Sequence, residues 1–345
     1  MKKKSIISLL LVLAMMLMAF TGCGSNEEAA PEEETQETTT ELTPIRISAI
    51  NAPTWAAVYI AQTQGFYEEE GLSAEFVTPG GPKGFQAMHA GDCEFAMLSQ
   101  EPLLVAQEQG MESKVVAAML NTRIYGFITT KDITEVSQLK GKNVYASDPG
   151  SAPFVFTSEV LKKGGLDPAT DVTLVQMADQ GAGMQAFLNG EVDGAFVNMS
   201  NLPVLGDFEY NVLVDTTDAA QSQEYLGSVD FPGEMLCTTK AYAEENPEVV
   251  QKTVNAVIKA EEWMASHSDE EVAAALSSVF GDVDPEVLAA EISYVRKQLK
   301  TDGMISEEGQ KAVVDMCIRA GIIQTEIPYE DVIDMSFAQA YAASK

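Results

Sequence analysis

The stretch Phe85–Ala96 reads FQAMHAGDCEFA, and a second stretch, Met184–Ala195, reads MQAFLNGEVDGA. Each begins with residues that favour a helix, reaches a glycine (Gly91 or Gly190), continues through an acidic turn and ends in an apolar run. Glycine is favoured just after a helix, where the backbone often adopts a left-handed conformation. Each stretch therefore predicts a helix, a turn and a strand, and their similarity predicts two lobes of related structure.

Short strands and helices alternate around both stretches, which predicts the α/β class. Around the first stretch, strands are predicted at Ile45–Ile50, Ala74–Thr78, Glu94–Ser99 and Lys114–Leu120. A helix is predicted at Thr54–Glu70, and a second, short helix follows Pro82 and ends at Ala90. Around the second, strands are predicted at Asn143–Ser147, Val172–Met177 and Gly194–Met199, with helices at Ala152–Gly164 and Ala182–Asn189. Strands separated by helices favour parallel pairing, with helices on the sheet faces.

From Ala241 onward the pattern is almost entirely helical. Helices are predicted at Pro247–His267, Asp269–Phe280, Asp284–Lys300, Ser306–Ala320 and Tyr329–Ala343. We expect them to pack against the first lobe, so the chain would cross between lobes twice, near Thr129–Glu135 and Tyr225–Glu234. This order divides the folded chain into residues 44–130 (lobe 1), 131–228 (lobe 2) and 229–345 (the mostly helical return to lobe 1).

The N-terminus has the features of an export signal. Lys2–Lys4 form a basic start, and Ser5–Phe20 is an apolar run shorter than the roughly 20 residues of a membrane-spanning helix. The next residues, up to Cys23, resemble the end of a bacterial lipobox; an ordinary signal peptide with a nearby cysteine is the alternative. We expect a signal peptide over residues 1–22, acylation of Cys23 as a membrane anchor, and a location at the outer face of the cytoplasmic membrane.

Residues 23–43 are expected to be the lipidated cysteine and a disordered tether. Gly24 to Thr43 contains seven glutamates and no basic residue, and such a stretch repels itself and has little apolar surface to bury. The formal net charge of the whole chain is -31, which argues against nucleic acid as a partner because phosphate binding needs clustered Lys and Arg. The length from Pro44 to Lys345 suits two lobes of ordinary size.

The remaining cysteines and the histidines give no sign of a metal or cofactor. Cys93, Cys237 and Cys317 lie in apolar contexts and are expected to be buried small residues; nothing in the sequence supports a Cys93–Cys237 bridge. The chain contains no CxxC motif and no Cys/His cluster, so we expect no structural metal and no cofactor. His89 and His267 lie among polar residues and are expected to be solvated.

Several motifs occur in the order typical of one protein family. They are PTWAAVYIA at Pro53–Ala61, GFYEEEGL at Gly65–Leu72, AMHAGD at Ala87–Asp92, LKGKNV at Leu139–Val144 and NPEVVQ at Asn246–Gln251. The set resembles the solute-binding proteins for nitrate, sulfonate, taurine and thiamine precursors, the SsuA/THI5-like (NMT1) family. The resemblance implies a type II periplasmic-binding-protein fold, in which two α/β lobes joined by a two-segment hinge close on a ligand. It also implies an ABC permease as partner, and we expect a monomer that is not an enzyme.

In open α/β sheets, ligands bind beyond the carboxyl ends of the strands. Residues at these predicted ends, or near the second crossing, are therefore candidate ligand contacts. They are Asn51, Thr54, Trp55, Gly80, Gly81, Ser99, Gln100, Asn121, Arg123, Tyr125, Ser147, Asp148, Gly150, Ser151, Asn198, Ser200, Asp230 and Glu234.

Each of these candidates also has a structural alternative. Trp55 could pack in the core, and Arg123 could form a structural salt bridge. Ser147–Ser151 could be a turn with a helix cap, and Asn198 and Ser200 could cap the next helix.

The nature of the ligand follows from charges near these positions. A buried carboxylate beside a bound anion is costly, and Asp148 and Glu101 both lie near the candidate loops. Trp55, Tyr125 and Phe154 could offer planar surfaces. We therefore favour a neutral, zwitterionic or heterocyclic organic ligand. A sulfonate remains the alternative, provided that Arg123 faces the ligand.

Two other functions remain open at this point. A lipoprotein with the same lobes could present its ligand to a receptor instead of an importer. An exported enzyme related to thiamine-pyrimidine synthases is the other alternative, although those enzymes use a cysteine-rich motif with histidine and iron, and this chain has no nucleophile–histidine pair or acid–base dyad.

Overall fold

A computed structural model describes residues 41–77, 80–177 and 179–345 of the chain. The predicted signal peptide, Cys23 and the tether as far as residue 40 lie outside the described residues. The first strand starts at Thr43, one residue before the expected start of lobe 1. None of the described helices combines the length and apolar character that crossing a bilayer requires.

The first sheet contains five strands in the order β2-β1-β3-β10-β4. Their bounds are Thr43–Ser48 (β1), Leu72–Val77 (β2), Phe95–Leu98 (β3), Ser113–Ala118 (β4) and Met235–Thr239 (β10). β1 pairs in parallel with β2 and β3, whereas β10 runs antiparallel to β3 and β4. We call this sheet and the helices on it lobe 1.

The second sheet repeats this arrangement with the order β7-β6-β8-β5-β9. Its strands are Tyr125–Thr130 (β5), Asn143–Tyr145 (β6), Thr173–Val175 (β7), Gly194–Asn198 (β8) and Tyr210–Asp215 (β9). β6 pairs in parallel with β7 and β8, and β5 runs antiparallel to β8 and β9. We call this sheet and its helices lobe 2.

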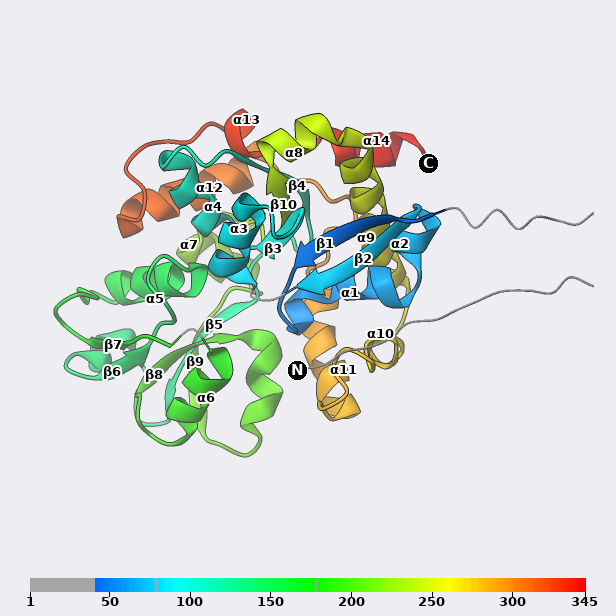
Figure 1. The fold of residues 1–345 in the computed structure, drawn as a ribbon. Coiled ribbons are helices and arrows are strands. Elements are labelled where there is room, and N and C mark those ends of the chain that lie inside the picture. The colour runs from blue at the N-terminus through cyan, green and yellow to red at the C-terminus, as the bar shows by residue number, and fades with distance from the viewer. Residues whose placement is uncertain (1–40, 78–79, 178) are drawn as a thin grey trace, which may run out of the picture. The chain divides into compact units, whose positions relative to one another are not determined.

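The expected parallel pairing is therefore wrong for part of each sheet. β5 comes directly from lobe 1 and β10 directly from lobe 2, and each takes the fourth place in its sheet (Figure 1). A parallel neighbour needs a crossover connection, usually a helix, that returns the chain to the same edge. Because β5 and β10 arrive from the other lobe, neither makes such a crossover within its sheet.

Two crossing segments connect the lobes: residues 119–124, between β4 and β5, and residues 226–234, before β10. The second lies where the sequence predicted it. The first lies earlier than predicted, because β5 already belongs to the second sheet; residues 125–130, expected in lobe 1, are part of lobe 2. The segments run side by side, since the Gly233 amide donates to the Leu120 carbonyl at 3.0 Å.

The repeated glycines end their helices as the sequence predicted. Gly91 (φ 82°) follows α3 and Gly190 (φ 74°) follows α6 by two residues. In both turns the amide after the glycine reaches back to a helical carbonyl, Asp92 to Ala87 and Glu191 to Ala186, each at 2.9 Å. The internal similarity thus corresponds to the same helix–turn–strand unit in each lobe.

The described helices differ from the predicted ones chiefly where glycine or a strand contact interrupts them. Gly65 (φ 77°) divides the predicted Thr54–Glu70 helix, and Ile333, which bridges to Val115 of β4, divides the predicted Tyr329–Ala343 helix. The helices are η1 (Pro53–Trp55), α1 (Ala56–Thr63), α2 (Phe66–Glu69), α3 (Gly81–Ala90), α4 (Gln100–Glu108), η2 (Val136–Leu139), α5 (Ala152–Lys163), α6 (Gln180–Leu188), η3 (Met199–Leu205), α7 (Ala219–Tyr225), α8 (Lys240–Glu245), α9 (Pro247–Ser266), α10 (Asp269–Ala275), α11 (Pro285–Arg296), α12 (Glu307–Ala320), α13 (Tyr329–Val332) and α14 (Ser336–Ala343).

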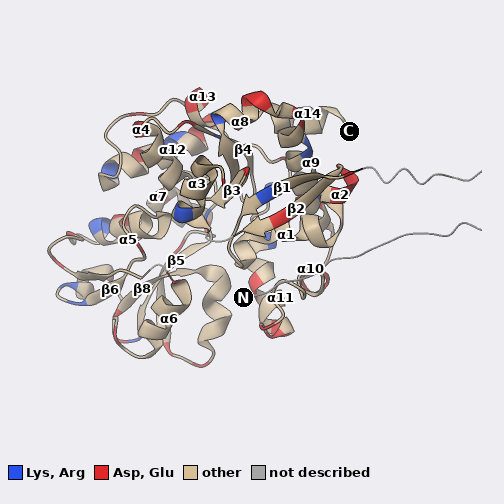
Figure 2. Cartoon of the chain, in the orientation of Figure 1, with Lys and Arg blue, Asp and Glu red and all other residues tan. Residues whose placement is uncertain are grey.

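The C-terminal helices pack mainly on lobe 1, as expected, with α9 against α1, α2 and α14. Two helices differ: α12 contacts α4 of lobe 1 and α5 of lobe 2, and α11 contacts η1 of lobe 1 and η3 of lobe 2. Asp and Glu are distributed over elements of both lobes (Figure 2). Cys93, Cys237 and Cys317 are free and buried, in agreement with the prediction.

Candidate functional site

In lobe 1, Trp55 lies in η1 directly after β1, with 4% of its surface exposed. Gly80, at the start of α3, lies against it: a Cβ on Gly80 would approach the indole to 3.0 Å and the Ile50 side chain to 2.6 Å. Only glycine lets the loop approach so closely. The structure thus brings two predicted contacts, Trp55 and Gly80, together, and Trp55 also packs within the lobe 1 core.

Ser99 and Gln100 follow β3 and begin α4. Gln100 is 1% exposed, and among the described residues neither its amide nitrogen nor its amide oxygen has a hydrogen-bond partner. Buried amides are nearly always hydrogen-bonded, so each exception requires an explanation. A bound molecule at the end of β3 would supply the missing partners.

Arg123, in the first crossing segment, forms a buried salt bridge. Its guanidinium lies 3.0 Å from the carboxylate of Glu101, and both side chains are 1% exposed. It also donates to the Pro232 carbonyl and the Tyr125 hydroxyl, each at 2.9 Å. The structural role that the sequence left open for Arg123 is therefore present, and its donors are engaged within the protein.

Glu234, in the second crossing segment, adds a second carboxylate to this cluster. Burial raises the pKa of Glu234, and the neighbouring Arg123 and a hydrogen bond from the Trp55 indole offset part of that rise. The indole therefore joins the helix after β1 to the second crossing segment. With Glu101 and Glu234 against one guanidinium, the cluster has one more carboxylate than cation.

In lobe 2, the loop after β6 carries a strained backbone. Ser147 has φ 63°, the left-handed region, and is 5% exposed. Such conformations cost energy in non-glycine residues and occur preferentially at functional sites. Asp148 is exposed, and Ser151 caps α5 by accepting from the Phe154 amide at 3.4 Å. The helix-cap alternative is therefore realised for Ser151, and Gly150 (φ 80°) forms the turn before it.

Asn198 is the last residue of β8, and Ser200 lies two residues further on, in η3. The Asn198 amide donates to the Gln180 side chain at 2.9 Å, but its oxygen, although buried, has no partner among the described residues. Ser200 is 1% exposed. Each lobe therefore presents an incompletely bonded amide at the carboxyl end of its third strand. Sequence reasoning missed Gln180, whose only sequence signal is its place at the start of a helix.

Other predicted contacts are engaged in structural hydrogen bonds or lie within the core. Asn51 accepts from the Tyr59 hydroxyl at 3.0 Å, and the Asn121 amide donates to the Leu299 carbonyl at 3.1 Å. Thr54 is 6% exposed within η1, Tyr125 is buried in lobe 2, and Gly81 starts α3.

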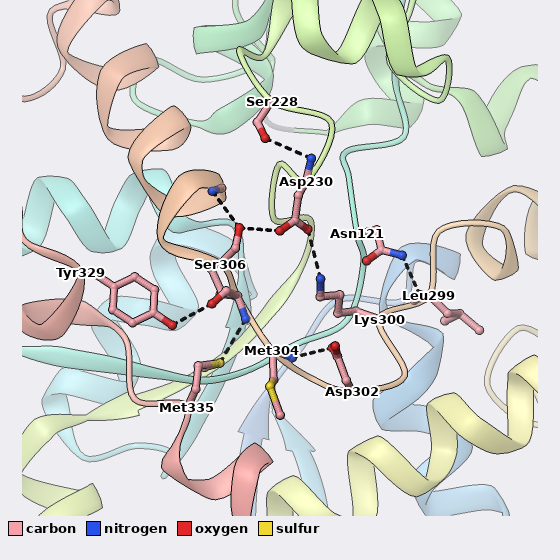
Figure 3. Close-up of polar contacts among 12 residues, drawn as sticks. Asn121, Ser228, Asp230, Leu299, Lys300, Asp302, Met304, Ser306, Tyr329 and Met335 are labelled. Carbon is pink, nitrogen blue, oxygen red and sulfur yellow. Dashed lines mark hydrogen bonds and ion pairs between the residues drawn. The ribbon is translucent and has the colours of Figure 1, made fainter. Parts of the chain in front are cut away.

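Asp230 belongs to a contact between the second crossing segment and residues 297–306, which follow α11. Its carboxylate accepts from Lys300 at 3.1 Å and from the Ser306 hydroxyl at 2.5 Å (Figure 3). The same residues 297–306 pair with the first crossing segment, since Lys300 donates to Met119 at 2.9 Å. Both crossings are thus tied to one further segment, which we call the brace.

Sequence reasoning did not include α11 in the site. This helix packs against η1, which carries Trp55, and against η3, which follows Asn198. It therefore contacts the candidate site from both lobes. The signal in the sequence is a single glutamate, Glu291, within the apolar face formed by Leu288, Ile292 and Val295.

An open groove of about 800 Å³ lies between α10 and α11, on the side lined by Phe280, Leu288 and Ala289. It contains none of the predicted contacts. Its carboxylate Asp269 is paired with Arg296 at 2.5 Å. We therefore place the candidate site at the strand ends and not in this groove.

Comparisons with known proteins agree with this architecture. The chain is 25% identical over 334 residues to the "Putative binding protein YtlA" of Bacillus subtilis, covering 92% of this chain and 93% of the relative. It is 27% identical over 342 residues to the "Putative aliphatic sulfonates-binding protein" of Bacillus subtilis, covering 95% of each. It is also 27% identical over 282 residues to the "Formylaminopyrimidine-binding protein" of Halalkalibacterium halodurans, covering 78% and 77%.

A solved structure shares the fold. It is the alkanesulfonate-binding protein SsuA from Xanthomonas axonopodis pv. citri, bound to MOPS, and it superposes with a TM-score of 0.69. The two sequences are 18% identical, and the superposition covers 86% of this chain and 99% of that one. The two sheets and two crossing segments thus have the two-lobed fold of the periplasmic binding proteins. A family model described as "NMT1/THI5 like" matches residues 52–271. The chain belongs to this NMT1/THI5-like family, which confirms the resemblance seen in the sequence.

Proposed function

We propose that this protein captures a small organic molecule between its two lobes and delivers it to the transmembrane subunits of an ABC importer. The observation that carries the proposal is the pair of incompletely bonded buried amides, Gln100 in lobe 1 and Asn198 in lobe 2. Gln100 begins the helix after β3, and Asn198 is the last residue of β8; ligands of open α/β sheets bind at such strand ends. A ligand that bonded both amides would hold the lobes together, which is how hinged binding proteins close.

The charges support an uncharged, zwitterionic or heterocyclic ligand in preference to a sulfonate. Arg123, the arginine among the predicted contacts, is paired with Glu101, and Glu234 adds a further carboxylate. Because Glu101 already balances the charge of Arg123, this cluster offers no uncompensated cation to a bound anion. The relatives include proteins named for sulfonates and for formylaminopyrimidine, and the charge cluster favours a ligand of the second kind.

Binding without catalysis is part of the same proposal. One relative over 141 residues is the "4-amino-5-hydroxymethyl-2-methylpyrimidine phosphate synthase" of Schizosaccharomyces pombe, which covers 40% of this chain. Both histidines of this chain lie outside the candidate site: His89 contacts Ser113 at 2.7 Å, and His267 stacks on Trp263. Neither is placed to act as a general base at the strand ends.

We further propose that a lipid on Cys23 holds the monomeric protein at the outer face of the cytoplasmic membrane. Copurification of an ABC permease would support import, and copurification of a receptor instead would support the ligand-presenting alternative. Labelling with radioactive fatty acid, and its loss in Cys23→Ser, tests the anchor.

Ligand binding is best tested with the chain from Cys23 onward. A thermal-shift screen of sulfonates, pyrimidines, other heterocycles and amines identifies a compound, and calorimetry gives its stoichiometry, expected to be one to one. Trp55→Phe keeps the buried ring but removes the indole N–H that bonds Glu234, and we expect it to weaken binding about tenfold. Trp263→Phe, at a position on α9 outside the site, is the matched control. Equal affinities in wild type and Trp55→Phe would remove Trp55 from the site.

A further inference from the structure

Glu291 occupies a distinctive place on α11. It lies one turn from Leu288, which is buried in lobe 1, and one turn from Tyr294 on the other side. Tyr294 lies on the lobe 2 side, near Tyr210 of β9. Burial raises the pKa of Tyr210, and the nearby Tyr294 makes a smaller contribution to that rise. Glu291 therefore lies at the boundary between the two lobes, on the helix that packs against η1 and η3.

The Glu291 side chain is mostly buried and has no partner among the described residues, although its carboxyl oxygens are not fully buried. Its residue is 6% exposed, and within the described part of the chain it makes no hydrogen bond or ion pair. Burial raises the pKa of Glu291 to about 7. A largely buried carboxyl that has no partner but is still reached by solvent is a candidate for contact with a bound molecule.

The elements around Glu291 offer it no cation. η1 (PTW) and η3 (MSNLPVL) contain no ionisable residue. On α10, Asp269 forms an ion pair with Arg296, so the charge of Arg296 is already engaged. Glu270 is exposed, and Glu271 caps its own helix by accepting a hydrogen bond from the Ser268 amide. A positive charge near this carboxyl would therefore have to come from a bound molecule.

We propose that Glu291 contacts the bound solute and selects for a cationic or strongly hydrogen-bond-donating group. This inference rests on the proposed function and specifies its ligand class. An ammonium or protonated heterocycle would ionise Glu291 and form a charge-assisted hydrogen bond, whereas a sulfonate would meet a carboxylate. Glu261 is a useful contrast, because both of its carboxyl oxygens are fully buried and unbonded, and it lies on α9, which packs against α1, α2 and α14 of lobe 1.

The test uses the chain from Cys23 onward and three probes that share one ring and differ in charge: benzylamine, benzyl alcohol and benzenesulfonate. We expect benzylamine to bind best, and to bind about tenfold more tightly near pH 8 than near pH 6, because ionised Glu291 predominates only above its pKa of about 7. Near pH 7, calorimetry in two buffers of different ionisation enthalpy should show release of about half a proton on benzylamine binding.

Glu291→Gln should weaken benzylamine binding about tenfold, leave benzyl alcohol unchanged, and abolish both the proton release and the pH dependence. Glu286→Gln, on the exposed side of the same helix, should match wild type. A preference for benzenesulfonate, or unchanged benzylamine binding in Glu291→Gln, would overturn the role of Glu291 while leaving solute binding intact. Failure of all three probes to bind saturably would count against the proposed function as well.

Discussion

The Arg123 guanidinium lies 3.0 Å from the Glu101 carboxylate, and this ion pair joins the first crossing segment to the start of α4 with both side chains 1% exposed. Removing one member of a buried pair leaves the other charge uncompensated, which costs about 3–5 kcal/mol. We therefore expect Arg123→Met to lower the free energy of unfolding by that amount in urea titrations. Arg319→Met, which breaks the more exposed pair with Glu159, should cost at most about 1 kcal/mol.

The double variant Arg123→Met/Glu101→Gln separates charge from packing. If the loss comes from the unpaired carboxylate, the double variant should recover more than half of it. A double variant as unstable as Arg123→Met would show that the hydrogen bonds of Arg123 to Tyr125 and Pro232 dominate.

The brace should control how readily the crossing segments open. Asp230→Asn removes the ion pair to Lys300 and weakens the contact with Ser306. We expect faster amide hydrogen exchange in residues 226–234 and 297–306, and a loss of about 1–2 kcal/mol in stability. Asp315→Asn, which breaks an exposed pair within α12, should leave exchange in both segments as in wild type.

Close contact between the crossings predicts a sensitive glycine. A Cβ on Gly233 would lie 2.4 Å from Leu120 Cβ and 2.9 Å from the Thr122 carbonyl. Gly233→Ala must push the crossings apart, at a cost of about 1–3 kcal/mol. Gly181→Ala meets only the Asp179 side chain, at 3.1 Å, and is the matched control. Similar melting temperatures for the two variants would mean that the crossings separate without strain.

The buried carboxyl of Glu261 should make stability depend on pH. Burial, followed by repulsion from Asp302 and Glu262, raises its pKa well above the ordinary value, with Lys300 opposing the shift. The folded state then binds the proton more tightly than the unfolded state, so stability falls as pH rises from the ordinary glutamate range towards the raised pKa. Urea titrations should show this slope in wild type and a smaller one in Glu261→Gln. The exposed Glu270→Gln should retain the full slope.

The left-handed backbone at Ser147 should be strained. Glycine adopts φ 63° without the Cβ clash, so Ser147→Gly is expected to be about 1 kcal/mol more stable than Ser147→Ala. The comparison with alanine removes the effect of the hydroxyl, which hydrogen-bonds Tyr145. Equal stability of the two variants would mean that the loop relaxes and stores no strain.

Sequence patterns predicted most of the parallel strands and helices, and the repeated unit ending at Gly91 and Gly190. They missed α4, α7, β5, β9 and β10. β5 and β10 lie wholly or almost wholly buried, and their apolar runs lie next to the crossings, where the alternation of strands and helices breaks down. The candidate site was predicted in outline, because strand ends are local features. The structural contacts of Asn121 and Asp230 were not predicted, and for Arg123 the salt bridge had been left open as an alternative to a ligand contact.

What the sequence determined by itself is therefore local: where helices stop, where strands begin and which family the chain resembles, because these depend on the preferences of neighbouring residues. The tertiary structure alone decided which groups meet. Arg123 donates to Pro232, 109 residues away, and Asn121 donates to Leu299, 178 residues away. Such pairings depend on the two crossings, by which the chain leaves lobe 1 to form β5 of the second sheet and leaves lobe 2 to form β10 of the first. No short-range pattern encodes these crossings.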